Sequence, residues 1–175
     1  MKAKAYGFFY LLIAVAAVLV TLKTLNWLPT ILQKDMLRRF DSIEEVRAKL
    51  NMRDVYVPSY FPESITWPPS EILAQTKPYP AVLIIFHAPK TRDATLVISQ
   101  AVSDAFTDNS LIPLVRIARA VPYDLKNRKA LLEVGTCANT EPCSRLSWTE
   151  NSYRIRLVMK APPFELIKIA ESMLR

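Results

Sequence analysis

The sequence predicts an α+β fold in which an N-terminal single transmembrane helix is followed by an antiparallel sheet of about five to six strands packed against a C-terminal helix. Three features lead to this prediction. Residues 6–22 are apolar and uncharged, short runs separated by turn residues fill most of 81–159, and 161–175 carry an amphipathic helical pattern. We expect three parts: a transmembrane signal anchor over 1–28, a juxtamembrane helical stalk over 29–53, and an extracytoplasmic α+β domain over 54–175.

The anchor is predicted from YGFFYLLIAVAAVLVTL, a run of 17 uncharged residues at 6–22. A helix that spans a bilayer needs about 17 to 25 mostly apolar residues. Apolar residues resume beyond Lys23, so its ammonium group can extend to the membrane surface while Trp27 lies at the level of the headgroups. A cleaved signal peptide is the alternative, but the Ala-x-Ala sequence from Ala14 to Ala16 lies inside the run instead of after it. We therefore favour an uncleaved anchor.

The orientation of the anchor is predicted from the cysteines. Cations follow the apolar run more densely than they precede it, so a bare positive-inside count places the C-terminal domain in the cytoplasm. Cys137 and Cys143, however, flank a turn-prone Asn-Thr-Glu-Pro between two strand-like runs, and a disulfide across such a hairpin persists only in an oxidising compartment. Two free thiols, or redox or metal chemistry, are the alternatives. We favour the disulfide, and with it a single-pass protein of the cell inner membrane whose C-terminal domain is periplasmic.

Residues 27–40 have the spacing of an amphipathic helix with three cations on its polar side. Lys34, Arg38 and Arg39 lie opposite the apolar stripe, and a helix of this kind can lie against anionic lipid headgroups. These three residues are therefore candidate membrane-surface contacts. The alternative is a stalk that continues the transmembrane helix or packs on the domain.

Two further helices are predicted from their N-terminal signals. A capping box formed by Ser42 and Glu45 predicts a short helix over 42–50. Pro162 and Pro163 mark the start of the C-terminal helix, because proline is compatible with the first turn of a helix. The C-terminal helix has one apolar stripe, which we expect to cover the open face of the sheet.

A proline-rich segment links the stalk to the sheet. Six prolines between residues 54 and 80 exclude a continuous helix and predict an ordered extended loop. Aromatic side chains in the loop indicate that it is attached to the domain. Four of them form a candidate aromatic contact patch: Tyr56, Tyr60, Phe61 and Trp67. Covering one face or edge of the sheet is the alternative role for this segment.

Six segments account for the predicted sheet. Five have the alternation or the apolar run of a strand: 81–88, 94–102, 128–135, 145–148 and 152–159. The sixth, 113–121, is ambiguous, because Arg116 and Arg119 fall on opposite faces of a strand but on the same side of a helix. Whether the predicted sheet has five or six strands therefore depends on how this one segment folds.

Three cations near the end of the last strand are candidate contacts for an acidic partner or an anion. Arg154 and Arg156 alternate with apolar residues and are expected to point outward, and Lys160 follows the strand. A solvated strand face with no specific ligand is the alternative.

The composition excludes several classes of function. The chain has 2 glycines, 1 histidine and 2 cysteines. Dinucleotide and phosphate loops and the nucleophile elbow need more glycines, and a multi-histidine metal site needs more histidines. We assign no catalytic residue, no metal and no cofactor, and a hydrolase that uses His87 is the weakest alternative. The formal net charge is +7, but no nucleic-acid-binding pattern accompanies it.

The order of segments resembles small extracytoplasmic domains of unknown function in bacterial membrane proteins. In those domains a proline-containing P-x-x-L/F-P-E loop precedes the sheet, and a W-x-x-x-x-Y-x-I/L hairpin precedes a helix that ends in I-A-E-S-M/L. The matching residues here are Pro58, Phe61, Pro62, Glu63, Trp148, Tyr153, Ile155, Ile169, Ala170, Glu171 and Ser172. The outline is also similar to the half-barrel folds of outer-membrane lipoprotein carriers and of periplasmic regulators of envelope-stress anti-sigma factors. The resemblance implies a non-catalytic binding or sensing domain and carries no functional residues with it.

Two functions follow as hypotheses. The first is a non-catalytic, membrane-anchored extracytoplasmic binding domain that serves as an accessory or assembly subunit of a larger membrane protein complex. The alternative is a carrier or sensor in the cell envelope that binds a lipid or a lipoprotein between sheet and helix. The expected partners are therefore the membrane, an envelope or membrane protein and, for the alternative, a lipid.

Overall fold

A computed structural model of the chain describes residues 17–18, 20–21, 23, 37–50, 52, 54–88, 93–103, 106 and 111–174. The chain divides into two compact units, Met1–Leu37 and Arg38–Arg175. Residues 17–18, 20–21 and 23 of the first unit are helical. The Thr21 hydroxyl donates a hydrogen bond of 2.8 Å to the carbonyl of Ala17 there, one turn earlier. The second unit contains every strand of the described residues and is the domain described below.

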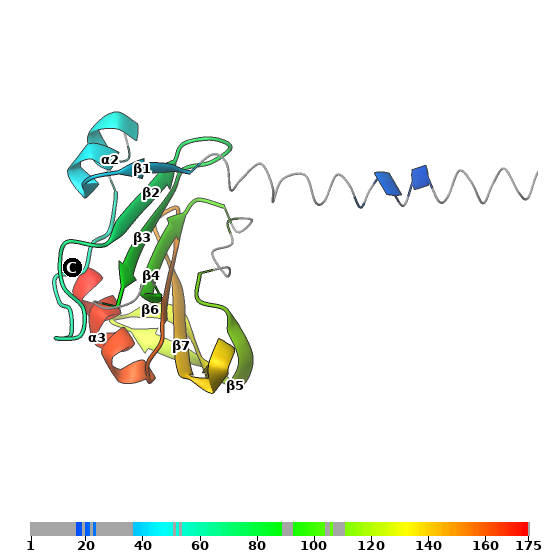
Figure 1. The fold of residues 1–175 in the computed structure, drawn as a ribbon, viewed down its shortest axis with the longest axis vertical. Helices are drawn as coiled ribbons and strands as arrows, with labels where there is room; N and C mark the ends of the chain where they lie inside the picture. Colours follow the sequence, from blue (N-terminus) through cyan, green and yellow to red (C-terminus); the bar gives the residue numbers. More distant parts are fainter. Residues whose placement is uncertain are drawn as a thin grey trace, which may run out of the picture. The chain divides into compact units, whose positions relative to one another are not determined.

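The domain consists of one sheet and two short α-helices (Figure 1). Its elements are β1 (Arg38–Phe40), α2 (Ile43–Leu50), β2 (Glu71–Gln75), β3 (Ala81–His87), β4 (Ala94–Ala101), β5 (Leu114–Leu125), β6 (Arg128–Cys137), the 3₁₀ turn η1 (Ala138–Thr140), β7 (Pro142–Glu150), β8 (Tyr153–Met159) and α3 (Pro163–Met173). The eight strands are antiparallel and lie in the order β1-β2-β3-β4-β8-β7-β6-β5. β1 and β5 are therefore the two edge strands.

The predicted fold class is wrong in two respects. The sheet has eight strands instead of five or six. Among the described residues, moreover, no helix is both long and apolar enough to cross a membrane. Most of the apolar run at 6–22 lies outside the described residues, and so does Lys34.

The two strands that the sequence did not predict are β1 and β2. Arg38–Phe40 was predicted to end an amphipathic helix, but it pairs with β2 instead. Glu71–Gln75 lies inside the proline-rich segment that was predicted to be loop, and it pairs with β3 along all five residues. The expected helical stalk at 29–53 therefore contains a strand and α2 in its described part. Both strands are short, and neither has enough alternating residues to signal a strand on its own.

Several other predictions are confirmed. The helix expected over 42–50 is α2, where the Ser42 hydroxyl accepts a hydrogen bond of 3.1 Å from the Glu45 N–H. The Glu45 carboxylate in turn accepts one of 2.8 Å from the Asp41 N–H. The C-terminal helix α3 begins at Pro163, as predicted. The ambiguous segment 113–121 belongs to a strand, β5.

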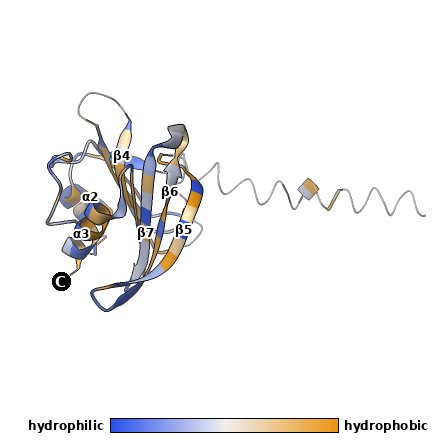
Figure 2. Cartoon of the chain, turned by 90° about the horizontal axis from the view of Figure 1, so that it is seen from below, coloured by the Kyte–Doolittle hydropathy of each residue, from blue (hydrophilic) through white to orange (hydrophobic). Residues whose placement is uncertain are grey.

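Both helices cover the same face of the curved sheet, which we call the helix face (Figure 2). α3 packs on β7 and β8, and α2 packs near β1 and β2. Leu146, Leu157, Leu166 and Ile169 are fully buried where α3 meets the sheet. Burial of a side chain of this size contributes about 1.5 to 3 kcal/mol to folding, so this contact supplies much of the stability of the domain.

The opposite side of the sheet, the outer face, is not uniform. In β3 and β4 nearly every residue is buried, on both faces. In β5 only Leu125 is buried. The sheet is therefore closed around β3 and β4 and open at β5.

Candidate functional site

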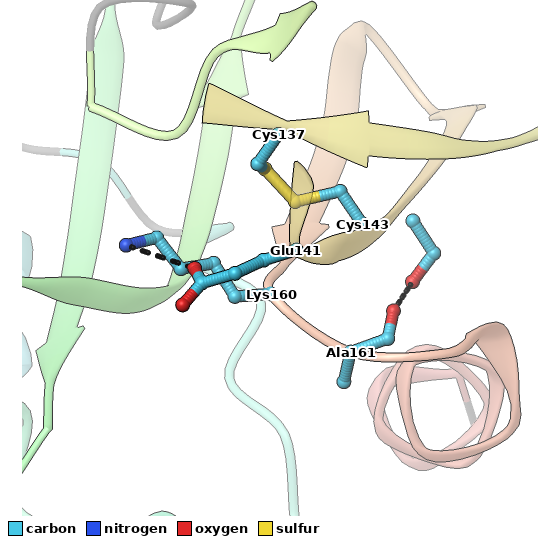
Figure 3. Close-up of a disulfide and its surroundings, with 6 residues drawn as sticks. Cys137, Glu141, Cys143, Lys160 and Ala161 are labelled. Atoms are coloured by element: carbon cyan, nitrogen blue, oxygen red, sulfur yellow. Dashed lines mark hydrogen bonds and ion pairs between the residues drawn. A yellow bond between two sulfur atoms is a disulfide. The ribbon is translucent and has the colours of Figure 1, made fainter. Parts of the chain in front are cut away.

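The predicted disulfide is present. Cys137 at the end of β6 is bonded to Cys143 near the start of β7, with Cα atoms 5.5 Å apart (Figure 3). Both cysteines are buried, and the loop between them contains η1. The Cys137 N–H also donates a hydrogen bond of 2.9 Å to the Glu141 carbonyl. The link thus closes the β6–β7 hairpin beside the first residues of β5, since Leu114 is the register partner of Cys137.

The three cations predicted near β8 do not form one cluster. Arg154 and Arg156 lie on the outer face as predicted, because they alternate with Ile155 and Leu157 of the core. Lys160 lies beyond the other end of the strand, where its Nζ atom is 3.8 Å from Glu141 Oε2 (Figure 3). Six residues of strand span roughly 20 Å, so Arg154 and Lys160 cannot bind the same small anion.

Another ion pair lies on the outer face of the neighbouring strands. The Arg145 guanidinium donates two hydrogen bonds to the Glu133 carboxylate, of 2.6 and 2.8 Å. The side chains of this pair are only 17% and 11% exposed. Because each charge is largely removed from water, each needs the other as its partner. The pair is therefore a structural clamp between β6 and β7.

The predicted membrane-surface cations are only partly described. Lys34 lies outside the described residues. Arg38 and Arg39 are exposed in β1, in a strand and not on one side of a helix. The Arg39 guanidinium lies 3.6 Å from the Glu71 carboxylate of β2, and an exposed pair of this kind contributes about 0 to 1 kcal/mol. These two cations stabilise the β1 edge at most weakly.

The four predicted aromatic residues do not form one patch. Phe61 and Trp67 stack with centroids 5.8 Å apart, and Phe61 lies 5.2 Å from Phe86 of β3. The Tyr60 hydroxyl donates a hydrogen bond of 2.8 Å to Glu165 of α3. Tyr56 contacts the ring of Tyr153, with centroids 6.4 Å apart. The proline-rich segment thus covers the sheet and fastens α3, which is the alternative role considered above.

A cleft of about 670 Å³ opens where Tyr56 meets the ends of several elements. Its lining is largely polar and comprises Arg47, Asp54, Val55, Tyr56, Val57, Arg128, Glu150, Asn151, Met173 and Leu174. Most of its polar groups are engaged within the protein. Arg47 donates to the Val55 carbonyl at 2.8 Å, and Arg128 donates two hydrogen bonds to Glu150.

The protonation equilibria in this cleft reflect the same contacts. Burial raises the pKa of Tyr56, and it also raises the pKa of Tyr153 beside it. The hydrogen bonds from Arg128 hold the pKa of the Glu150 carboxyl below its ordinary value. At neutral pH Glu150 is therefore ionised and both tyrosines are neutral. Neither state provides a proton acceptor or donor suited to acid–base catalysis near pH 7.

His87 lies at the end of β3, beside a second hollow of about 440 Å³ that is also lined by Arg39, Ser70 and Glu71. No serine could be assigned from the sequence as a nucleophile beside His87. The structure places Ser70 next to it. The Ser70 hydroxyl, however, accepts a hydrogen bond of 3.0 Å from the backbone N–H of His87. Within the described part of the chain the imidazole makes no hydrogen bond to Ser70 or Glu71, so these residues do not form a catalytic relay.

The most exposed cluster of apolar residues on the sheet lies at β5, where the sequence predicted no site. Its residues, which we call the β5 patch, are Val115, Ile117, Ala120, Pro122 and Leu131. Ile117 pairs with Gly135 and Pro122 with Leu131, and both pairs lie on the outer face because Leu132 points to the core. Val115 lies in a bulge between Leu114 and Arg116. Figure 2 shows hydrophobic and hydrophilic residues alternating along this edge.

Gly135 holds β5 close to β6 at the patch. A methyl group on this residue would overlap the Arg116 carbonyl oxygen and press on the Ile117 Cα atom. The absence of a side chain therefore lets the bulged part of β5 lie directly over β6. A signal for this arrangement is present in the sequence, because Gly135 is the only glycine between residue 8 and the C-terminus.

Comparison of the chain with known protein families, with curated proteins and with solved structures finds no match. The resemblance to envelope domains therefore stays a prediction from the sequence. The described residues contain no group of three or more His, Cys, Asp or Glu side chains arranged to hold a metal ion. The β5 patch and the polar cleft are the two surfaces that remain as candidates for binding.

Proposed function

We propose that residues 38–175 form a non-catalytic binding domain that works outside the cytoplasm and docks on another protein of the cell envelope, as an accessory subunit of a larger membrane complex. The observation that carries this proposal is the β5 patch. Val115, Ile117 and Leu131 are 69%, 48% and 41% exposed, although the same sheet buries almost every apolar residue of β3 and β4. Groups of exposed apolar side chains are typical of surfaces that bind another protein.

The disulfide supports the proposed compartment. A link between Cys137 and Cys143 is stable where the surroundings are oxidising, as they are outside the bacterial cytoplasm. The carrier hypothesis has less support. An acyl chain needs an apolar cavity, whereas the described cleft is lined largely by polar groups, and Leu157 and Ile169 fill the contact between sheet and α3.

The docking proposal is tested by purifying the full-length chain in mild detergent under native conditions and determining the mass of the complex. We expect a second protein in a fixed ratio to the chain. An unrelated protein of the same membrane, tagged and purified in parallel, identifies contaminants. A homogeneous preparation of the chain alone would contradict docking, and bound lipid in place of a protein would favour the carrier.

The compartment is tested separately with a single new thiol. Ser152 is exposed in the turn between β7 and β8, and the native cysteines are joined to each other. The variant Ser152→Cys is therefore expected to react with a membrane-impermeant maleimide in cells whose outer membrane alone has been opened. Labelling that requires rupture of the inner membrane would place the domain in the cytoplasm and contradict the proposal.

A further inference from the structure

Two arginines of β5 form a third candidate for binding, apart from the β5 patch and the polar cleft. Arg116 and Arg119 are three residues apart, so a regular strand would place them on opposite faces. β5 is not regular here, because a register shift between Ile117 and Arg119 leaves Ala118 as an extra residue. The two arginines therefore lie on the same face of the sheet, and the expectation from the sequence is corrected by the bulge.

That face is the helix face. Arg119 pairs with Val134, which packs against the core, and Arg116 pairs with Thr136, two residues further along β6. Two residues of a strand span about 7 Å, and an arginine side chain is long enough to bridge that separation. Both guanidinium groups can therefore reach one point above β5. The β5 patch lies on the outer face, so this pair is separate from it and does not depend on the proposed docking function.

The donors of the pair are not used within the described part of the protein. Arg116 and Arg119 are both exposed, and neither makes an ion pair with a described residue. Arg128 and Arg145 differ from them, because each donates two hydrogen bonds to one carboxylate. Two like charges at neighbouring positions repel each other, and a bound anion removes this repulsion.

The arginines that are already paired indicate which anion fits. One guanidinium is enough to satisfy the carboxylate of Glu133 or of Glu150. Two converging guanidinium groups offer more donors than a carboxylate accepts. A phosphate group has more oxygens, and its geometry suits bidentate hydrogen bonds from arginine. We propose that Arg116 and Arg119 together bind one phosphate group, either on an anionic lipid headgroup or as free phosphate.

NMR of the full-length chain in a neutral detergent tests the proposal, with isotope-labelled arginine so that the guanidinium Nε–H signals are observed. The probes are inorganic phosphate, acetate at equal ionic strength, and dihexanoyl phosphatidylglycerol, a short-chain lipid with a phosphate headgroup. The variants Arg116→Lys and Arg119→Lys each remove one signal and so assign it. Arg128 and Arg145 serve as internal controls, because their guanidinium groups are already paired.

We expect phosphate to move the signals of Arg116 and Arg119 with one common half-saturation concentration and to leave those of Arg128 and Arg145 in place. Acetate should move them much less. Movement of one arginine alone, equal movement of all four, equal effects of acetate and phosphate, or no movement would each overturn the proposal. Saturation by the short-chain lipid at a lower concentration than by inorganic phosphate supports the site with a lipid headgroup as the source, and the reverse order supports it with free phosphate as the source.

Neutralisation of one arginine provides the second arm. Arg119→Gln is expected to raise the phosphate concentration that half-saturates the Arg116 signal about three- to fivefold, in the upper part of the range for an exposed ion pair. Lys77→Gln, in the exposed segment before β3, removes a positive charge elsewhere and is expected to leave that concentration unchanged. An Arg145 signal at its wild-type position shows that the sheet of each variant is folded. An unchanged concentration in folded Arg119→Gln would mean that the two arginines act separately and would overturn the shared site.

Discussion

β3 and β5 belong to one antiparallel sheet, yet they differ in how their apolar residues are used. All of Ala81–Phe86 in β3 is buried, and β2 and β4 flank the strand at its two edges. β5 has 12 residues, of which only Leu125 is buried. Its apolar residues on the helix face pack on the core, whereas those on the outer face do not.

The difference teaches that apolar content alone does not separate a folding residue from a binding residue. Ile84 in β3 and Ile117 in β5 are the same amino acid in the same sheet, but they are 0% and 48% exposed. What separates them is the position of the strand. A central strand offers no free surface, while an edge strand with bulges does.

Substitution of these two isoleucines is expected to give the largest contrast. Ile84→Ala removes fully buried methyl and methylene groups and should lower the free energy of unfolding by about 2 to 5 kcal/mol. Ile117→Ala removes exposed groups and should change it by less than about 0.5 kcal/mol. Urea denaturation followed by tryptophan fluorescence measures both. A cost above about 1.5 kcal/mol for Ile117→Ala would show that the β5 patch is needed for folding and would remove the main argument for a binding surface.

A substitution at Gly135 is expected to displace β5 without touching the centre of the sheet. Gly135→Ala introduces a methyl group against backbone atoms of β5, which cannot move aside as a flexible side chain does. We expect a loss of about 3 kcal/mol, at the upper end of the usual range for overpacking. Hydrogen exchange measured by mass spectrometry should locate the loosening in β5 and spare β3.

Thr136→Ala, at the next residue of β6, is the control for the Gly135 variant, because it removes atoms instead of adding them. We expect it to leave exchange in β5 close to that of the wild type. Equal protection of β5 in Gly135→Ala and wild type would contradict the close approach of the two strands.

Removal of the disulfide is expected to have an intermediate effect that is again confined to the β5–β6 side. The bond closes a loop with a sequence separation of 6, and a loop of this length corresponds to about 2.4 kcal/mol on the loop-entropy relation. The double variant Cys137→Ser and Cys143→Ser should therefore unfold at a lower urea concentration than the oxidised wild type. Wild type under reducing conditions is the matched comparison, and equal midpoints for oxidised and reduced protein would show that the link contributes nothing.

The sequence predicted the central and C-terminal parts of the fold because their signals are local. A capping box at Ser42, paired prolines at the start of α3 and the alternation around Ile155 each determine structure within a few residues. β1 and β2 escaped prediction because they are three and five residues long and depend on pairing with each other and with β3. The preference of so short a segment for a strand depends on the strands beside it, and its own sequence does not show them.

The candidate site was harder to predict than the fold, for a related reason. Arg154 and Arg156 were placed correctly on the outer face by alternation, but alternation does not reveal what surrounds a face. The exposure of Ile117 depends on β5 being the last strand and on its bulges, and both follow from the order of strands in the sheet. A proline inside a strand pattern, Pro122, was the available signal, because proline in a sheet favours an edge.

The smallest expected effect concerns pH and again separates the two regions. The centre of the sheet around β3 and β4 is held by apolar contacts. β6 and β7 are also joined by Arg128 and Glu150, at 2.8 and 3.0 Å, at the ends of the two strands that lie away from the turn between them. The pKa of the Glu150 carboxyl in the folded state lies below its ordinary value of 4.5. A carboxyl with a lowered pKa contributes stability that is fully present above the pKa of the unfolded chain and is lost as the pH falls through the folded pKa.

The variant Glu150→Gln should therefore unfold at a lower urea concentration than wild type at pH 7. The difference between the two midpoints should shrink below about pH 4.5, because the wild-type carboxyl is then protonated and, like the glutamine, carries no charge. Taking the difference between two proteins cancels the titration of every other group they share. The partly exposed side chains of this pair limit the effect to less than that of Ile84→Ala, of Gly135→Ala or of the loss of the disulfide. A difference that persisted unchanged at pH 3 would mean that Glu150 stabilises the β6–β7 pair by packing and not by its charge. The region around β3 and β4 and the region around β6 and β7 would then both be held by packing contacts.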